Sequence, residues 1–195
     1  APSNETIQNK FSAIKNVLDW SVRNEYIQPP NPWTDVSVDV GEPRVSYRDW
    51  TEEELQRVFS LDMPQEDFLC LAILACTGAR LDEIALLEWD QFEKGITKGG
   101  EWVHWLDTTD AIVKNATSRR LIPILPKVAE LIKHHPRGLN KKEPNRLFTW
   151  AKDVDGKAEN KASRALMKHL RKVLTDDNFA VHGLRHTVTS MLRVE

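Results

Sequence analysis

The chain has 195 residues, of which 41% are hydrophobic and 29% are charged, so it has the composition of a folded globular protein and not of a disordered one. No apolar run approaches the roughly 20 residues that a membrane-spanning helix needs. Cys70 and Cys76 lie six positions apart on different faces of one predicted helix, so a disulfide between them is not expected, and a reducing, cytoplasmic setting fits. The net charge of −2 conceals a division, because residues 1–93 carry −11 and residues 94–195 carry +9, so the second half is suited to attract phosphate groups.

The first predicted element is an amphipathic helix that runs to about Tyr26, because four apolar side chains recur at helical spacing: Ile7, Phe11, Ile14 and Leu18. Pro29-Pro30 then ends the helical pattern. One helix cannot bury its own apolar stripe, so we expect residues 1–38 to be the C-terminal part of a helical domain whose earlier part is missing. Residues 39–48 contain glycine and proline without a sustained period, which predicts a linker.

A second domain is predicted over residues 49–195. Thr51 and Glu54 have the spacing of a capping box, in which the two side chains satisfy backbone amides at the start of a helix. Residues 68–76 are apolar at every position, which favours a buried helix, and Thr77-Gly78 ends it.

The composition changes in the middle of this domain. A helix is expected from Leu81 to about Asp90, and three short strands follow, at residues 102–106, 111–113 and 121–124. Helical patterns resume over residues 126–134 and from Asn160 to about Leu174. The fold class is therefore α+β, mostly helical, with a small three-stranded antiparallel sheet inserted between the helices.

Two short motifs carry residues suited to phosphate chemistry. Arg80 follows a glycine at a predicted helix start, where its guanidinium and nearby backbone amides can face an anion, and Glu83 lies three residues on. His182 and Arg185 are also three apart and therefore share one face of a helix. Arginine supplies two fixed donors to a phosphate, and histidine can serve as acid, base or donor.

These motifs resemble those of the tyrosine recombinase, or phage integrase, family. Residues 77–84 (Thr-Gly-Ala-Arg-Leu-Asp-Glu-Ile) resemble its first-arginine motif, and residues 182–186 (His-Gly-Leu-Arg-His) resemble its histidine-x-x-arginine motif. The predicted strands lie between the two motifs, where the family has its sheet, and Lys114 stands at the turn that carries the family's catalytic lysine. The residues around Tyr26 and Asn31-Pro32-Trp33 resemble the end of the family's N-terminal DNA-clamping domain.

The resemblance implies a site-specific recombinase that breaks and rejoins double-stranded DNA through a 3′-phosphotyrosyl intermediate. It implies Arg80, Lys114, His182 and Arg185 as catalytic residues. No metal or other cofactor is expected, because the arginines stabilise the negative charge on the phosphate that a metal ion would otherwise stabilise. The family works as a tetramer on paired DNA sites, whereas a fragment of this length is expected to be a monomer.

The sequence departs from the family's pattern at the nucleophile. The family's tyrosine lies beyond the position of His186, and this sequence ends at Glu195 with only Tyr26 and Tyr47 present, neither in the nucleophile's place. The chain also begins without methionine. We therefore expect a fragment of a longer enzyme that is itself unable to cleave DNA.

Three other interpretations stay open at this point. A noncatalytic DNA-binding module could keep the same fold, and a type IB topoisomerase would share the same chemistry. His182 and His186 are also four apart on a helix, which allows a metal site, although Gly183 replaces the glutamate that follows the first histidine in zinc proteases.

Overall fold

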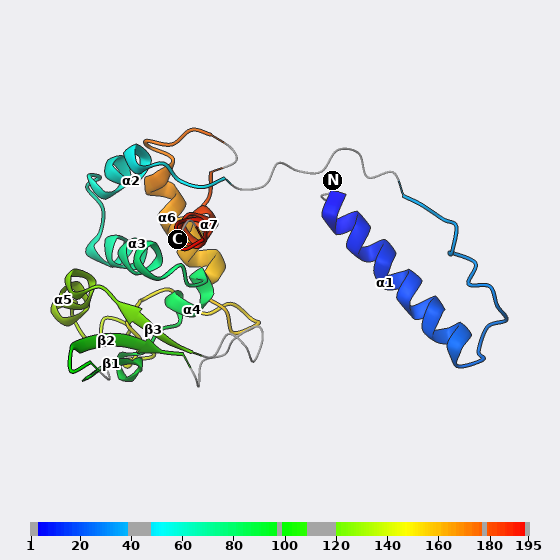
Figure 1. Ribbon diagram of the computed structural model, residues 1–195, viewed down its shortest axis with the longest axis horizontal. Coiled ribbons are helices and arrows are strands. Elements are labelled where there is room, and N and C mark those ends of the chain that lie inside the picture. The colour runs from blue at the N-terminus through cyan, green and yellow to red at the C-terminus, as the bar shows by residue number, and fades with distance from the viewer. Residues whose placement is uncertain (1–3, 39–47, 97–98, 109–119, 177–178, 194–195) are drawn as a thin grey trace. The chain divides into compact units, whose positions relative to one another are not determined.

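The computed structural model describes residues 4–38, 48–96, 99–108, 120–176 and 179–193. The chain divides into two compact units, residues 1–46 and residues 47–195 (Figure 1). In the described parts of both units, no helix is at once long enough and apolar enough to cross a membrane.

The first unit is a helix with a segment folded back along it. Helix α1 (Asn4–Arg23) confirms the predicted amphipathic helix but ends three residues before Tyr26, because Glu25 adopts a positive φ of 63° that a helix cannot accommodate. The buried Asn31 side chain donates a hydrogen bond to the Asp19 carboxylate at 2.6 Å. Trp33 stacks on Phe11 with ring centroids 4.9 Å apart, so an apolar contact also holds the returning segment on α1.

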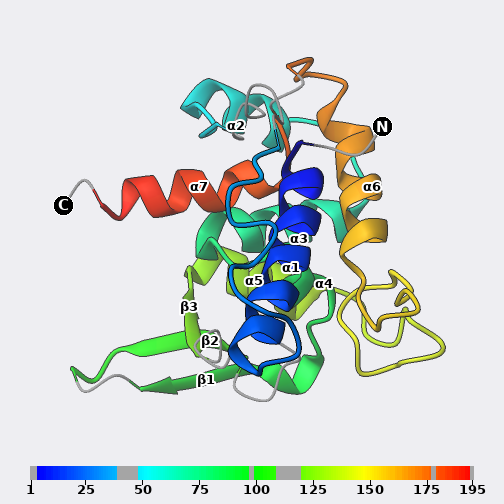
Figure 2. The same ribbon diagram turned by 90° about the vertical axis from the view of Figure 1, so that its right-hand side faces the viewer.

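The second unit is built around helix α3 (Gln65–Thr77), which confirms the predicted buried helix. Leu71 and Ile73 have no exposed surface at all. Figures 1 and 2 both show α3 in the middle of this unit, between helix α2 (Glu52–Phe59) and the sheet. Its other neighbours are α4 (Leu81–Ala85), α5 (Pro126–His134), α6 (Glu159–Leu170) and α7 (His182–Met191).

Helix α4 is shorter than the sequence predicts. It ends at Ala85, and a separate 3-10 turn covers Trp89–Gln91. The expected continuous helix to Asp90 is wrong because the backbone after α4 pairs elsewhere. The Leu87 carbonyl accepts a hydrogen bond from the Leu147 amide at 2.8 Å, and the Trp89 amide donates to the Asn145 carbonyl at 2.8 Å.

The sheet has three antiparallel strands in the order β1 (Phe92–Ile96), β2 (Trp102–Asp107) and β3 (Leu121–Ile124). Strands β2 and β3 confirm two of the predictions, whereas β1 was not predicted and the expected strand at residues 111–113 lies outside the described residues. A glycine weakens a strand pattern, and β1 has Gly95 at its fourth position. A Cβ there would lie 2.1 Å from the Trp105 ring, so glycine is required for the ring to cover the strand.

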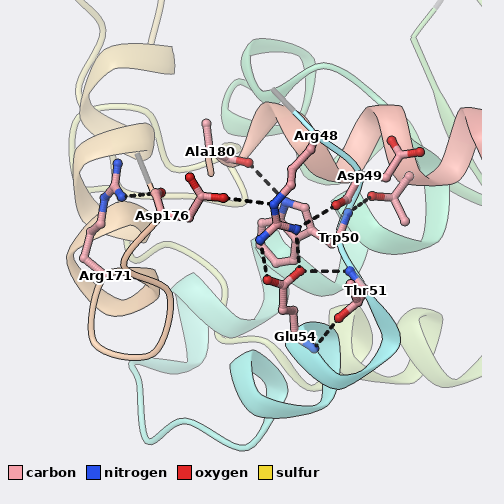
Figure 3. Close-up of polar contacts among 9 residues, drawn as sticks. Arg48, Asp49, Trp50, Thr51, Glu54, Arg171, Asp176 and Ala180 are labelled. Atoms are coloured by element: carbon pink, nitrogen blue, oxygen red, sulfur yellow. Dashed lines mark hydrogen bonds and ion pairs between the residues drawn. The ribbon is translucent and has the colours of Figure 1, made fainter. Parts of the chain in front are cut away.

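An arginine fixes the point at which the chain enters the second unit (Figure 3). The Arg48 guanidinium donates two hydrogen bonds to the Glu54 carboxylate, at 2.8 and 2.5 Å, and a third to Asp176 at 3.0 Å. Glu54 also accepts from the Thr51 amide at 2.9 Å while Thr51 Oγ1 accepts from the Glu54 amide, which confirms the predicted capping box. The carboxylate thus caps α2 and holds Arg48 at once.

Stability should depend on pH through this carboxylate. The Arg48 hydrogen bond lowers the pKa of Glu54 from 4.5 to about 2, so its contribution to stability is present above about pH 4.5 and is lost as the pH falls toward 2. Because Arg48 is partly exposed, Glu54→Gln should destabilise the protein by about 1 kcal/mol at neutral pH, or roughly 2–4 °C in Tm.

Thermal unfolding followed by circular dichroism across this pH range tests the prediction. Glu52→Gln, an exposed position in the same helical turn, is the control and should shift Tm less. The prediction is contradicted if the difference in Tm between Glu54→Gln and the unsubstituted protein is the same at pH 2 as at neutral pH.

Candidate active site

Two of the predicted residues that lie far apart in the sequence meet in one pocket. Arg80 and Arg185 both line a cavity of about 380 Å³ in the second unit. The rest of its lining comes from the end of α3 and the residue after it, from the residue before β3, and from the last part of α7 and the residue after it: Thr77, Gly78, Arg120, Val188, Thr189 and Leu192. The two guanidinium groups can therefore face the same small anion.

Arg80 is held by a buried carboxylate. It occupies the N-cap position of α4, and its backbone amide donates to Glu83 Oε2 at 3.1 Å. Its guanidinium donates to Glu83 Oε1 at 2.9 Å, and the Glu83 side chain is only 4% exposed. Because one carboxylate fixes both the backbone and the side chain of Arg80, the guanidinium is positioned before any ligand arrives.

Arg185 is held by the turn that precedes Arg80. Its guanidinium donates to the Gly78 carbonyl at 2.6 Å, which links α7 to the end of α3. Burial lowers the pKa of Arg185 from its ordinary value, and the nearby positive charge of Arg80 lowers it further. Arg80 and Arg185 thus bring two positive charges to the same pocket.

Gly78 allows the two arginine-bearing segments to approach. It ends α3 in the left-handed conformation, with φ 60°, and its amide donates to the Leu74 carbonyl at 2.9 Å. A Cβ at this position would lie 3.0 Å from Val188 Cγ1 of α7. Glycine is therefore favoured here both by backbone conformation and by the close packing of α7.

The start of α7 is held on its other side by Trp50 (Figure 3). The Trp50 amide donates to Thr187 Oγ1 at 2.8 Å, and its indole donates to the Ala180 carbonyl at 3.2 Å. A Cβ on Gly183 would lie 2.6 Å from the indole nitrogen, so this glycine lets the helix lie directly on the ring. Gly78 and Gly183, the glycines of the two arginine motifs, thus both allow α7 to pack closely against its neighbours.

His182 lies beside this pocket. It is the first residue of α7, it is exposed, and it is not among the residues that line the cavity. Partial burial lowers its pKa, and the neighbouring charges of His186 and Arg185 lower it further, so the neutral ring is favoured. The His182 and His186 rings meet edge to face at 5.0 Å, and within the described ranges no third histidine, cysteine, aspartate or glutamate joins them in a metal-binding group.

The structure also identifies residues that the sequence prediction did not assign to the site, whereas the predicted Lys114 lies outside the described residues. Arg120 lines the pocket and pairs with Glu83 at 3.3 Å. Its only signal in the sequence was its place next to the lysine turn. Arg146 is fully buried and donates to the Ala85 carbonyl, which supports α4 at the end opposite Arg80. No local pattern indicates that contact, because its two residues are 61 positions apart.

Comparison with solved structures shows which fold carries this pocket. A Tn1549 transposon integrase in complex with a circular intermediate DNA superposes with a TM-score of 0.64 at 18% identity, over 100% of this chain and 68% of that one. Lambda integrase, solved as a tetramer bound to a Holliday junction, gives 0.59 at 13% identity, over 94% of this chain and 52% of that one. The chain has the tyrosine recombinase fold.

Further comparisons distinguish similarity of structure from similarity of sequence. XerA recombinase gives a TM-score of 0.50 at 16% identity, over 94% of this chain and 60% of that chain. No protein-family model and no curated protein sequence matches the chain. The tyrosine recombinase likeness is thus one of fold, and the two arginine motifs lie on that fold in a shared pocket.

Replacing Gly78 should test the packing that brings the arginines together. Gly78→Ala places a side chain at φ 60° and against Val188, so we expect a loss of about 2–3 kcal/mol in the free energy of unfolding. Gly138→Ala is the matched control, because Gly138 also has a positive φ of 71° but a Cβ added there would meet nothing within 4 Å. Urea denaturation measures the free energy of unfolding of both variants. Equal losses in the two would show that the contact with α7 contributes nothing.

Proposed function

We propose that this chain contains the phosphate-binding part of the active site of a site-specific DNA recombinase of the phage or prophage integrase type. The observation that carries the proposal is the single pocket shared by Arg80 and Arg185. The fold supports it, because the Tn1549 and lambda integrases, which have similar structures, were both solved with DNA. The reaction is the breaking and rejoining of double-stranded DNA through a 3′-phosphotyrosyl intermediate.

In this mechanism the two arginines act on the nonbridging oxygens of the scissile phosphate. Attack by a tyrosine hydroxyl forms an O–P bond and breaks the bond from phosphorus to the 5′ oxygen, and negative charge builds on the nonbridging oxygens in between. Arg80 and Arg185 are already fixed by Glu83 and by the Gly78 carbonyl. Donors that need no reorganisation stabilise such a transition state most effectively.

Two further side chains handle protons in the proposal. The attacking tyrosine loses its proton as the 5′ oxygen leaves, and that oxygen must gain one. Lys114 is proposed as the general acid for the 5′ oxygen, since the sequence predicts a turn there and an ammonium at such a turn can approach when DNA is bound. His182, whose lowered pKa favours a neutral ring, is proposed to accept the tyrosine proton or to donate to the phosphate.

The residues proposed above bind the phosphate or move protons, and none of them is the nucleophile. Tyr26 lies in the first unit, where it stacks on Trp20, and Tyr47 lies outside the described residues. Catalysis by the two arginines can be tested without a tyrosine nucleophile.

The partner is proposed to be double-stranded DNA. The lysines and arginines of the second half of the sequence provide the positive charge, and we propose that the first unit is the end of a domain that clamps the duplex. A tetramer on paired DNA sites is proposed for the full-length enzyme by analogy with lambda integrase, which was solved as a tetramer on a Holliday junction.

A substrate that replaces the tyrosine ester tests the catalytic claim. The substrate is a duplex with a nick in one strand. One end at the nick carries a 3′-p-nitrophenyl phosphate, and the other end carries a free 5′-hydroxyl. Attack by the 5′ oxygen forms the new O–P bond of the phosphodiester, breaks the bond from phosphorus to the p-nitrophenyl oxygen and passes the hydroxyl proton to solvent. The p-nitrophenolate leaves without needing a proton. The chain should accelerate this release, and Arg80→Ala or Arg185→Ala should slow it about a hundredfold or more.

Arg57→Ala is the control, because Arg57 is an exposed arginine on α2 and does not line the pocket. Its rate should equal that of the unsubstituted chain. Binding to the same duplex, measured by fluorescence anisotropy, should weaken steeply as salt rises. Salt-sensitive binding without any acceleration of release would favour the noncatalytic DNA-binding module instead, and absence of binding would contradict the proposal altogether.

A further inference from the structure

We propose that Arg120 is a third arginine that binds the same phosphate as Arg80 and Arg185. The inference rests on the proposed function and extends it, because neither arginine motif contains this residue. Arg120 precedes β3 in the chain and lines the pocket together with the other two arginines. Its role would be to contact a phosphate oxygen from the side of the sheet.

The backbone of Arg120 is fixed to the end of β2. Its carbonyl accepts hydrogen bonds from the amide and the hydroxyl of Thr108, at 3.1 and 2.8 Å, and its amide donates to the same hydroxyl at 3.2 Å. Thr108 is itself buried, with 1% of its surface exposed. The Cα of Arg120 is therefore held by the fold, as a ligand in a preorganised site should be.

The side chain of Arg120 shares its anchor with Arg80. The Glu83 carboxylate accepts from Arg80 through Oε1 at 2.9 Å and from Arg120 through Oε2 at 3.3 Å. One buried carboxylate thus holds two guanidinium groups at the wall of one pocket. A carboxylate with two oxygens can orient two arginines toward a common ligand in this way.

The exposure of Arg120 separates it from an arginine that only supports the fold. The Arg120 side chain is 34% exposed, the same fraction as Arg80, whereas the Arg146 side chain is 0% exposed and donates to a backbone carbonyl. Arg120 thus keeps surface that a ligand can reach at the pocket it lines, and Arg146 has none. The geometry therefore groups Arg120 with Arg80.

The clustering of arginines in the pocket also suits an anion. Among the described residues that line it are three guanidinium groups, two of which pair with the Glu83 carboxylate. Burial lowers the pKa of Arg185, and the positive charges of Arg80 and Arg120 lower it further, so the three groups lie close enough to act on one another. A phosphodiester carries one negative charge and gains more on its nonbridging oxygens as a nucleophile attacks, so clustered guanidinium groups suit the transition state better than the ground state.

Nuclear magnetic resonance of the arginine Nε–H groups tests the inference directly. The 195-residue protein, labelled with nitrogen-15, is titrated with inorganic phosphate, and Arg80, Arg120 and Arg185 are assigned from Arg→Lys variants. All three signals should shift along one binding curve. Arg120→Ala should weaken phosphate binding about tenfold or more, as the loss of a charged hydrogen bond does, and Arg120→Lys should weaken it less.

The control is Arg57→Ala, which removes the same charge from an exposed position on α2 and should leave phosphate binding unchanged. Thermal unfolding of each variant shows whether it is folded. Shifts of Arg80 and Arg185 without Arg120, with unchanged affinity in Arg120→Ala, would overturn this inference and leave the proposed function standing.

Two other outcomes also decide the matter. If Arg120→Ala weakens phosphate binding but phosphate does not shift the Arg120 signal of the unsubstituted protein, Arg120 acts by positioning Glu83 and not as a ligand, and the inference is wrong. If phosphate shifts none of the three signals, the proposed function fails with it.

Discussion

The contact between α7 and the turn after α3 is the interaction on which the whole site depends. The Gly78 carbonyl accepts a hydrogen bond from Arg185, and the missing side chain of Gly78 lets Val188 lie against the same residue. Arg80 follows two residues later and caps α4. A side chain at position 78 would press on Val188 of α7, the helix that carries Arg185, so the packing of a glycine helps to set the geometry of a charged pocket.

The rest of the second unit holds that contact in place. Trp50 and Thr187 fix α7 from the side opposite α3, and Arg48 in turn ties the segment before Trp50 to α2. On the other side, the buried Arg146 holds the last carbonyl of α4. Crowded like charges oppose folding, so a pocket of arginines is stable only where acceptors hold the guanidinium groups, and here these acceptors are the Gly78 carbonyl and the buried Glu83 carboxylate. Positions such as Gly78, Gly183 and Glu83 therefore belong to the site although they do no chemistry.

Local signals in the sequence predicted much of this fold, and the missed features depend on distant contacts. The capping box at Thr51, the apolar helix α3 and the break at Gly78 are read from neighbouring residues, and all three are confirmed. Strand β1 was missed because Gly95 weakens its pattern, and only the Trp105 ring of the paired strand explains that glycine. Helix α4 was predicted too long because its end is set by pairing with residues 145–147.

The same distinction applies to the site. Arg80 and Arg185 were found because each stands in a short motif, but their meeting in one pocket depends on the packing of α3 and α7. Arg120 and Arg146 carry no motif, and their partners Glu83 and Ala85 lie 37 and 61 positions away. A charged residue outside a motif looks like any surface residue until its partner is known.

The central claim is that Arg80 and Arg185 bind one tetrahedral oxyanion, and anomalous X-ray diffraction from a crystal soaked in tungstate tests it most directly. Tungstate resembles phosphate in shape and charge, and its metal atom gives an anomalous signal that marks its position. The account predicts a peak in the pocket with oxygens within hydrogen-bond distance of both guanidinium groups. Tungstate bound elsewhere on the protein, with no peak between these two arginines, would contradict it.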